Sequence, residues 1–224
     1  KKERILKNQL LIIIVILVII LSSLDINAQS LTWLGTLGRD VSTAYGVSDD
    51  GSVVVGESDN LFENSRAFTW TASSGIQPLN TLQNINSWAS HITPDGNIVV
   101  GSANVGAFNY QAMKWTSNGG VEFLGTLGGS GSTNNSEGTF CLPDGSIVVG
   151  AAATASNNHH AFKWTSSNGM EDLGTFNNVN NYVSKANSIS DDGSLIVGYS
   201  EYNSGYYRPC YWLNSTINEL LTSM

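Results

Sequence analysis

The sequence predicts an all-β fold, namely a β-propeller or part of one built from four-stranded antiparallel blades. Three observations support this prediction: a pattern that occurs four times at intervals of 45, 49 and 48 residues, short β-branched segments inside each copy, and an Asp-Gly turn in each copy. Repeats with a period of roughly 20 to 50 residues are typical of propellers, solenoids and related arrays. No stretch beyond the N-terminal segment keeps a helical period, so helical repeats are excluded.

Glycine and tryptophan at fixed spacings define the four copies. In each copy, the glycine of the Asp-Gly pair is followed five residues later by a second glycine and nineteen residues later by a tryptophan. The three positions are Gly51, Gly56 and Trp70, then Gly96, Gly101 and Trp115, then Gly145, Gly150 and Trp164, and finally Gly193, Gly198 and Trp212. They predict a single repeat domain over residues 29–224. Its repeats are expected at approximately 39–82, 83–127, 128–176 and 177–224.

Each copy is expected to contain four short strands in chain order. In the first copy the first three are residues 44–48 (AYGVS), 52–56 (SVVVG) and 66–70 (RAFTW), whose β-branched and aromatic residues suit a pleated sheet. The Asp-Gly pair between the first two supplies the positive φ of a tight hairpin turn. The fourth strand is seen in the second copy as EFLGTLG, residues 122–128. Four strands per unit match a propeller blade, whereas the rungs of a stacked β-solenoid, the alternative, are usually shorter.

The two ends of the array depart from this pattern. Residues 31–38 (LTWLGTLG) match a fourth strand that has no other three before it, so a lone strand is expected there. This strand either completes the last blade and closes a ring or belongs to an array longer than this sequence. The last copy ends in LNSTINELL, and the absent initiator Met indicates an incomplete chain.

The first 28 residues resemble a secretory signal peptide rather than part of the fold. Basic residues precede twelve consecutive apolar residues, 10–21, and small residues follow, ending at Ala28. The alternative is an uncleaved membrane anchor, but the apolar run is shorter than the roughly 18 to 20 residues that span a bilayer. The mature chain is therefore expected to be secreted, extracellular or on a bacterial cell surface, without a membrane span.

Charge excludes one class of partner. Without residues 1–28 the chain keeps 6 basic and 16 acidic residues, a net charge near −10, so a nucleic-acid partner is not expected. The remainder is rich in Gly, Asn, Ser and Thr, yet its regular Val, Ile and Trp positions favour a folded core over disorder.

Loop variation predicts where a ligand would bind. The connection from the fourth strand to the next blade varies in length, and the nine residues between the second and third strands vary in sequence. Both emerge on the same face of an up-and-down blade, so one face is uniform and the other is varied. We expect the varied face to bind a ligand, although unselected drift is an alternative.

Trp88 is the most informative candidate on this face. At its register position the other copies carry Thr43, Glu137 and Lys185, so a large aromatic replaces solvent-tolerant groups. Trp88 is expected to stack on a sugar or a partner side chain, or else to be an incidental surface residue. The other ligand-binding candidates, expected near the same rim, are Arg66, Tyr110, His160, Tyr206, Tyr207 and Arg208.

Catalytic, metal and disulfide sites are not predicted. The four Asp-Gly aspartates, Asp50, Asp95, Asp144 and Asp192, occupy one turn position per blade and do not converge. His159 and His160 are adjacent on a strand, so their side chains point to opposite faces and do not chelate one ion. Cys141 and Cys210 align with apolar core positions in different blades, so both are expected to be free thiols. No cofactor is predicted.

The motifs together resemble a known class of repeat. His160, Ala161 and Phe162 before Trp164, a similar Arg-Ala-Phe before Trp70, the VS-x-DG-x-VVVG strand pair and the LGTLG segments are similar to the HAF-type extracellular repeats of bacterial exported proteins. The resemblance covers roughly residues 31–221. It implies an exported β-repeat protein, without an established shared activity.

Three functions are compatible with these features. The first is a non-catalytic extracellular or cell-surface binding or adhesion module, whose glycan or protein ligand the sequence does not identify. The second is a carbohydrate-active enzyme or an accessory domain of one, because propellers support paired carboxylates on one face. The third is an architectural segment of a longer surface protein. Candidate carboxylates for the enzyme are Glu57, Asp59, Glu63, Glu137 and Glu201.

Overall fold

Each copy of the repeat folds into one antiparallel sheet, because its β-branched segments are joined by turns tight enough for neighbouring strands to pair. The computed structural model describes residues 31–62, 64–79, 85–106, 109–129, 135–179, 181–203 and 205–219. The described residues from Leu34 onward belong to one compact unit. The predicted signal peptide, residues 1–28, lies outside the described residues. No helix in the described part of the chain is long and apolar enough to cross a membrane.

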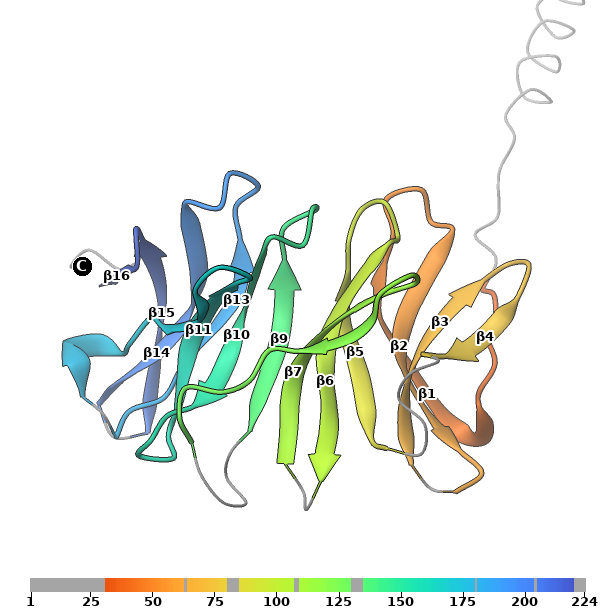
Figure 1. Ribbon diagram of the computed structural model, residues 1–224, viewed down its shortest axis with the longest axis horizontal. Helices are drawn as coiled ribbons and strands as arrows, with labels where there is room; N and C mark the ends of the chain where they lie inside the picture. Colours follow the sequence, from red (N-terminus) through yellow and green to blue (C-terminus); the bar gives the residue numbers. More distant parts are fainter. Residues whose placement is uncertain are drawn as a thin grey trace, which may run out of the picture. The chain divides into compact units, whose positions relative to one another are not determined.

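The strands follow the chain in groups of four (Figure 1). The first sheet contains β1 (Gly38–Val47), β2 (Val53–Asn60), β3 (Ser65–Thr71) and β4 (Gly75–Pro78). The second contains β5 (Ser87–Ile92), β6 (Ile98–Gly106), β7 (Asn109–Thr116) and β8 (Gly120–Phe123). The third contains β9 (Ser136–Cys141), β10 (Ile147–Ala153), β11 (His159–Thr165) and β12 (Gly169–Asp172), followed by the short 3-10 helix η2 (Phe176–Asn178). The fourth contains β13 (Ser184–Ile189), β14 (Leu195–Asn203), β15 (Tyr206–Leu213) and β16 (Thr216–Glu219).

Sheet order confirms the predicted blades. Within every sheet the strands pair in chain order, all antiparallel, so each blade is a simple meander. The first strands β1, β5, β9 and β13 approach one another from sheet to sheet. One such contact is the hydrogen bond from the Thr139 hydroxyl to the Ala186 carbonyl, at 2.7 Å. Blades that meet along their first strands form the inner side of a propeller.

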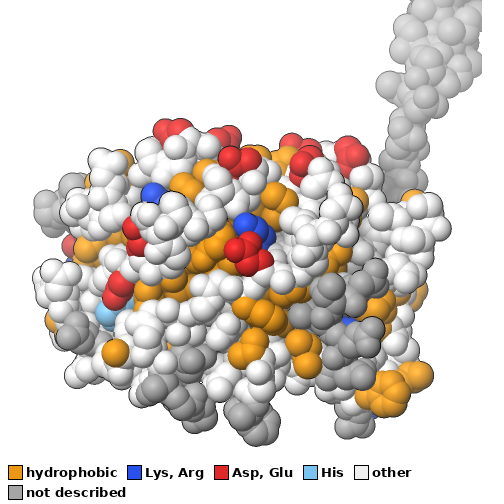
Figure 2. Space-filling model, in the orientation of Figure 1, with side chains coloured by type: hydrophobic (Ala, Val, Ile, Leu, Met, Phe, Trp, Pro, Cys, Tyr) orange, Lys and Arg blue, Asp and Glu red, His pale blue; other side chains and the backbone are white. Residues whose placement is uncertain are grey.

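The Asp-Gly pairs form the turns between first and second strands, as predicted. Gly51, Gly96, Gly145 and Gly193 have φ between 66° and 74°, the region that favours glycine. Asp50 accepts hydrogen bonds from the backbone N–H of Ser52 at 2.9 Å and the hydroxyl of Ser48 at 2.7 Å, which lower its pKa to about 2. In Figure 2 acidic side chains gather along the edge where these turns lie in Figure 1.

The second glycine of each copy lets two strands approach unusually closely. A Cβ on Gly101 would overlap the carbonyl oxygen of Trp88, and the other three copies show the same overlap with Thr43, Glu137 and Lys185. The approach occurs where the first strand bulges, with a register shift next to Ala89 in the second sheet. The glycine therefore fixes the backbone of the residue that is Trp88 in the second blade.

The hydrophobic core lies between successive sheets rather than within one of them. Trp212 is fully buried against the third sheet, and its indole N–H donates to the Leu173 carbonyl at 2.8 Å. Cys141 lies in the core between the second and third sheets and Cys210 in the core between the third and fourth. Both side chains are buried thiols, and burial raises their pKa to about 12.

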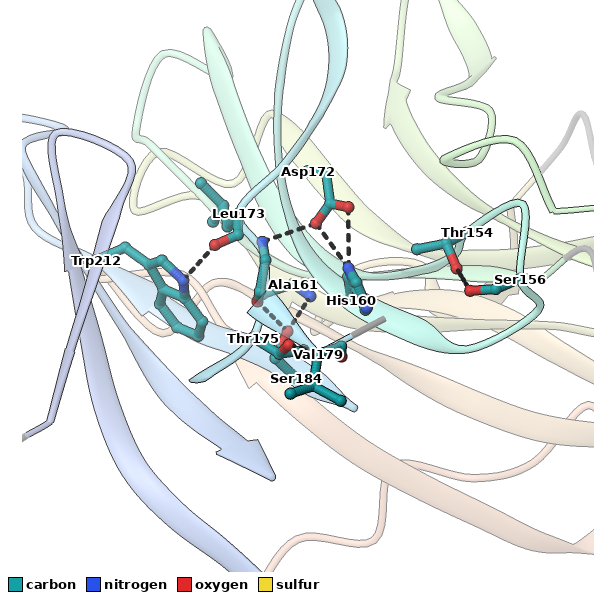
Figure 3. A network of polar contacts seen from close by, with 11 residues as sticks. Thr154, Ser156, His160, Ala161, Asp172, Leu173, Thr175, Val179, Ser184 and Trp212 are labelled. Atoms are coloured by element: carbon teal, nitrogen blue, oxygen red, sulfur yellow. Dashed lines mark hydrogen bonds and ion pairs between the residues drawn. The ribbon is translucent and has the colours of Figure 1, made fainter. Parts of the chain in front are cut away.

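A buried serine joins each sheet to the one before it, which the sequence interpretation missed. Ser184, on β13, accepts a hydrogen bond from the Ala161 N–H at 2.8 Å and donates to the Gly174 carbonyl at 2.6 Å (Figure 3). Ser136, in the same register position of the third sheet, makes both bonds to the second sheet and its connector. A backbone donor and acceptor that face the core are thereby satisfied.

The prediction of a lone strand at residues 31–38 is wrong. Residues 31–37 form no strand, and β1 begins only at Gly38. The predicted fourth strands were also placed too late, because β8 ends at Phe123, before the LGTLG residues. The segment 34–37 instead docks on the first sheet like a connector between blades: the Leu37 N–H donates to the Ser58 hydroxyl at 2.9 Å, as the Phe176 N–H does to Ser200.

The predicted nine-residue loops between second and third strands are shorter than expected. β2 continues to Asn60 and β3 begins at Ser65, while β6 and β7 are separated by only two residues, 107–108. Antiparallel pairing continues past the last apolar residue of each strand, so the polar residues of these segments belong to the hairpins. Much of the varied face is therefore strand, with fixed side-chain directions.

Candidate functional site

A pocket of about 380 Å³ lies where the second, third and fourth sheets converge at the ends of their first strands. The varied loops emerge at the same end of the strands. Its lining residues are Trp88, Tyr110, Asn135, Ser136, Glu137, Ala151, His159, Val183, Ser184, Lys185 and Tyr199. The lining combines three aromatic rings with one carboxylate, one ammonium and one imidazole, a composition typical of a binding pocket.

Repeat register explains why these side chains meet. Trp88, Glu137 and Lys185 each lie eight residues before the Asp-Gly glycine of their copy, so equivalent strand positions bring them to equivalent places. Tyr110 and His159 likewise share one register position on the third strands. The repeat therefore supplies a rigid frame, and differences between the copies supply the chemistry.

Aromatic rings form one wall of the pocket. The Trp88 and Tyr110 rings lie with centroids 5.1 Å apart and planes tilted by 42°. The Tyr110 backbone N–H donates to the Asn135 side-chain carbonyl at 2.7 Å, which anchors β7 to the segment that precedes β9. This packing holds the Trp88 ring in a fixed orientation, so the wall is formed before any ligand binds.

Charges in the pocket balance. The Lys185 ammonium lies 2.6 Å from a Glu137 carboxylate oxygen, and each side chain is about one quarter to one third exposed. Burial lowers the pKa of His159 below its usual range, although the nearby Glu137 carboxylate opposes that shift. The imidazole is therefore neutral at pH 7, and the pocket as a whole carries no net charge.

Two further hollows border this pocket. One, of about 460 Å³, is lined by Tyr45, Glu57, Trp88 and Ser90. The other, of about 370 Å³, is lined by Tyr199 and Tyr207, whose rings meet edge to face at 5.4 Å. Trp88 thus lines both the pocket and the first hollow, and Tyr199 lines both the pocket and the second.

Of the ligand-binding candidates that the sequence analysis expected on one rim, some lie at the pocket and others lie away from it. Trp88 and Tyr110 line the pocket, and Tyr207 lies beside it. Strand alternation directs His160 to the other face of β11, where it lines a different pocket. Tyr206 and Arg208 flank Tyr207 on β15, and neither lines the pocket. Arg66 occupies on β3 the register position that His160 has on β11, and it does not line the pocket either.

Two of the displaced residues form equivalent cross-strand pairs. The His160 Nδ1 atom lies 2.9 and 3.0 Å from the Asp172 carboxylate oxygens (Figure 3). Arg208 donates to the Glu219 carboxylate and lies with its guanidinium 3.7 Å from the Tyr202 ring centroid. Both pairs join the third strand to the fourth, so they stabilise the outer part of a blade.

Sequence reasoning missed part of the pocket. Lys185 and Glu137 were recognised as register equivalents of Trp88 but were read as solvent-tolerant groups, and Tyr199 and His159 were not singled out as ligand-binding residues. The signal was present in the sequence. Equivalent positions on first strands meet at the propeller axis, so Trp88, Glu137 and Lys185 could have been taken as neighbours.

The four described carboxylates among the five considered for catalysis do not converge on the pocket, and Asp59 does not line it. Among the described residues Glu137 lines it and Glu57 lines the hollow on the other side of Trp88. The buried Glu201 accepts hydrogen bonds from the Val183 and Gly205 backbone N–H groups, and Glu63 lies outside the described residues. Within the described part of the chain no three His, Cys, Asp or Glu side chains are grouped to hold a metal ion.

The sequence matches no protein-family model and no curated protein. Its fold is similar to solved structures at low identity. A candidate TolB from Agrobacterium tumefaciens matches with a TM-score of 0.58 at 14% identity, over 79% of this chain and 63% of that protein. TolB from Acinetobacter baumannii matches with a TM-score of 0.59 at 17% identity, over 84% of this chain and 45% of that one.

A puromycin hydrolase matches with a TM-score of 0.52 at 12% identity, over 82% of this chain and 29% of the hydrolase. This chain therefore spans less than two thirds of each of these proteins. At such identities the likeness concerns the fold alone. Together with the four meander sheets, it shows that the chain is an all-β partial propeller of four blades.

Proposed function

We propose that this protein is an exported, non-catalytic binding module of the HAF-type repeat class, and that the pocket beside Trp88 binds a neutral carbohydrate. The observation that carries the proposal is the combination of a fixed aromatic wall with balanced charges. The rings of Trp88 and Tyr110 offer flat apolar faces, which suit the C–H face of a sugar. Asn135, Glu137 and His159 offer donors and acceptors at the edge of the same pocket, which suit its hydroxyl groups.

Electrostatics favours an uncharged ligand. Glu137 and Lys185 already neutralise each other, so an anionic or cationic ligand would have to break their ion pair or remain unpaired. Nucleic acid is disfavoured by the acidic chain, whose formal net charge is −8 even with residues 1–28 included.

The ion pair of Glu137 and Lys185 also favours a binding function over an enzymatic one. Glycoside hydrolysis ordinarily needs two carboxyl groups, about 5 to 10 Å apart, that face one bond. Among the described residues the pocket contains one, Glu137, and Lys185 holds it in an ion pair. Residues 1–28 direct export in this proposal, which places the pocket where extracellular glycans occur.

Direct binding measurements test the proposal. We expect the purified protein to bind neutral glycans on an array, and Trp88→Ala to weaken that binding about tenfold or more, as the loss of a central aromatic contact usually does. Tyr206→Ala is the matched control, because Tyr206 is 72% exposed and lies outside the pocket lining. Melting temperatures verify that both variants fold.

Three results would overturn the proposal. The first is unchanged glycan affinity in folded Trp88→Ala, and the second is no glycan binding by the parent protein. The third is release of shortened sugar products that stops in Glu137→Gln, which would make the protein an enzyme.

A further inference from the structure

The three hollows described above form a row with shared walls. Trp88 lines both the pocket and the hollow that contains Tyr45, and Tyr199 lines both the pocket and the hollow that contains Tyr207. Each pair of neighbouring hollows therefore shares one aromatic side chain. The row crosses all four blades, from Tyr45 on β1 to Tyr207 on β15.

Aromatic and polar groups alternate along this row. Tyr45 stands at one end, with its hydroxyl donating to Glu57 at 2.6 Å. Trp88 follows, then the ion pair of Glu137 and Lys185, then the two tyrosines of the fourth blade. Such alternation suits a ligand that presents an apolar face and hydroxyl groups at regular intervals.

Among the described residues, the Glu57 carboxylate is the one charged group that lines the outer hollows. Glu57 accepts hydrogen bonds from the Tyr45 hydroxyl at 2.6 Å and the Ser65 hydroxyl at 2.8 Å. Lysine and arginine do not line either outer hollow among the described residues. An anionic polymer would gain no partner here, and burying its charges without partners would oppose binding.

We infer that the site accommodates a linear, neutral oligosaccharide that extends through all three hollows, with Trp88 and Tyr199 between successive subsites. This inference rests on the proposed function and adds the shape and length of the ligand. The half-exposed rings of Tyr45 and Tyr207, 50% and 56% exposed, are the outer stacking platforms. A single sugar fills the central pocket alone, whereas a longer chain also contacts the outer rings.

Affinity as a function of chain length tests the inference. The probes are three neutral series of one to six units, built from glucose, mannose or N-acetylglucosamine, titrated into the purified protein by calorimetry. We expect at least one series to bind, and its hexamer to bind about tenfold or more tightly than its dimer, because two further rings are contacted. Tyr45→Ala and Tyr207→Ala should each reduce that gain from dimer to hexamer, and Tyr206→Ala should leave it intact.

The possible failures are distinguishable. Equal affinity for dimer and hexamer, with Trp88→Ala still weakening binding about tenfold or more, would overturn the extended site and leave the proposed function standing. No binding of any series would overturn both. Displacement of a bound hexamer by neutral peptides with equal affinity would overturn the assignment to a sugar chain.

Discussion

Replacing Ser184 with alanine is expected to weaken the junction between the third and fourth blades. The side chain is fully buried, and its hydroxyl satisfies two backbone groups of the third blade and its connector, the Ala161 N–H and the Gly174 carbonyl. Alanine leaves both groups buried without a partner. Each such group costs about 1 to 3 kcal/mol, so the free energy of unfolding should fall by about 3 kcal/mol.

Thermal unfolding followed by circular dichroism measures this loss. For a chain of this size about 3 kcal/mol corresponds to a fall of about 6 to 12 °C in melting temperature. Amide hydrogen exchange at Ala161 should also accelerate, because its N–H loses its acceptor. The control is Ser194→Ala, which removes a hydroxyl from an exposed turn where it bonds only to the Asp192 carboxylate.

The reasoning about the buried serine fails if Ser184→Ala and Ser194→Ala melt within about 2 °C of each other. It also fails if Ala161 exchange is unchanged. Either result would mean that water or a local shift satisfies the two backbone groups.

Three further changes probe other features of the repeat. Gly101→Ala should both lower stability and reduce ligand binding, because the new methyl group overlaps the Trp88 carbonyl and displaces that residue. Calorimetric melting measures the stability, and glycan titration measures the binding. A loss of binding without destabilisation would contradict the mechanism. Burial lowers the pKa of His91 from 6.5 to about 4, so its neutral form contributes stability that is complete above pH 6.5 and lost as the pH falls to about 4. After allowance for the partial exposure of His91, the loss of stability amounts to about 2 kcal/mol. Denaturant unfolding measures the free energy of unfolding at pH 7 and at pH 4, and His91→Phe should reduce the difference between the two values by this amount. Cys141 and Cys210 should react with a thiol reagent only after unfolding, because burial raises the pKa of both to about 12; rapid labelling of the folded protein would contradict their core positions.

The sequence by itself determined the architecture of the blades. Short strands of β-branched residues, positive-φ glycines in the Asp-Gly turns and a constant spacing to the tryptophan are local constraints, and each is met in the structure. The core positions of Cys141 and Cys210 followed from alignment of the copies. Repetition strengthened these predictions, since every local preference was observed four times.

Strand ends and loops were predicted less well, because backbone pairing does not stop where apolar residues stop. The polar residues after Gly56 continue β2 to Asn60, and the leucine segment 34–37 docks as a connector without forming a strand. The serine junctions were missed for a related reason. In the sequence, a serine at a strand position is indistinguishable from a surface residue. Its burial and its hydrogen bonds depend on how the neighbouring blade packs against it.

The site was decided by tertiary structure. Trp88 was identified from the sequence because it departs from its register, but Glu137, Lys185 and Tyr199 join it only where first strands from different blades converge. Strand alternation, set by the hairpin register, directed His159 into the pocket and His160 away from it. Local sequence specifies which residues form a blade, whereas the packing of one blade against the next, which depends on contacts far apart in the chain, specifies which side chains share a pocket.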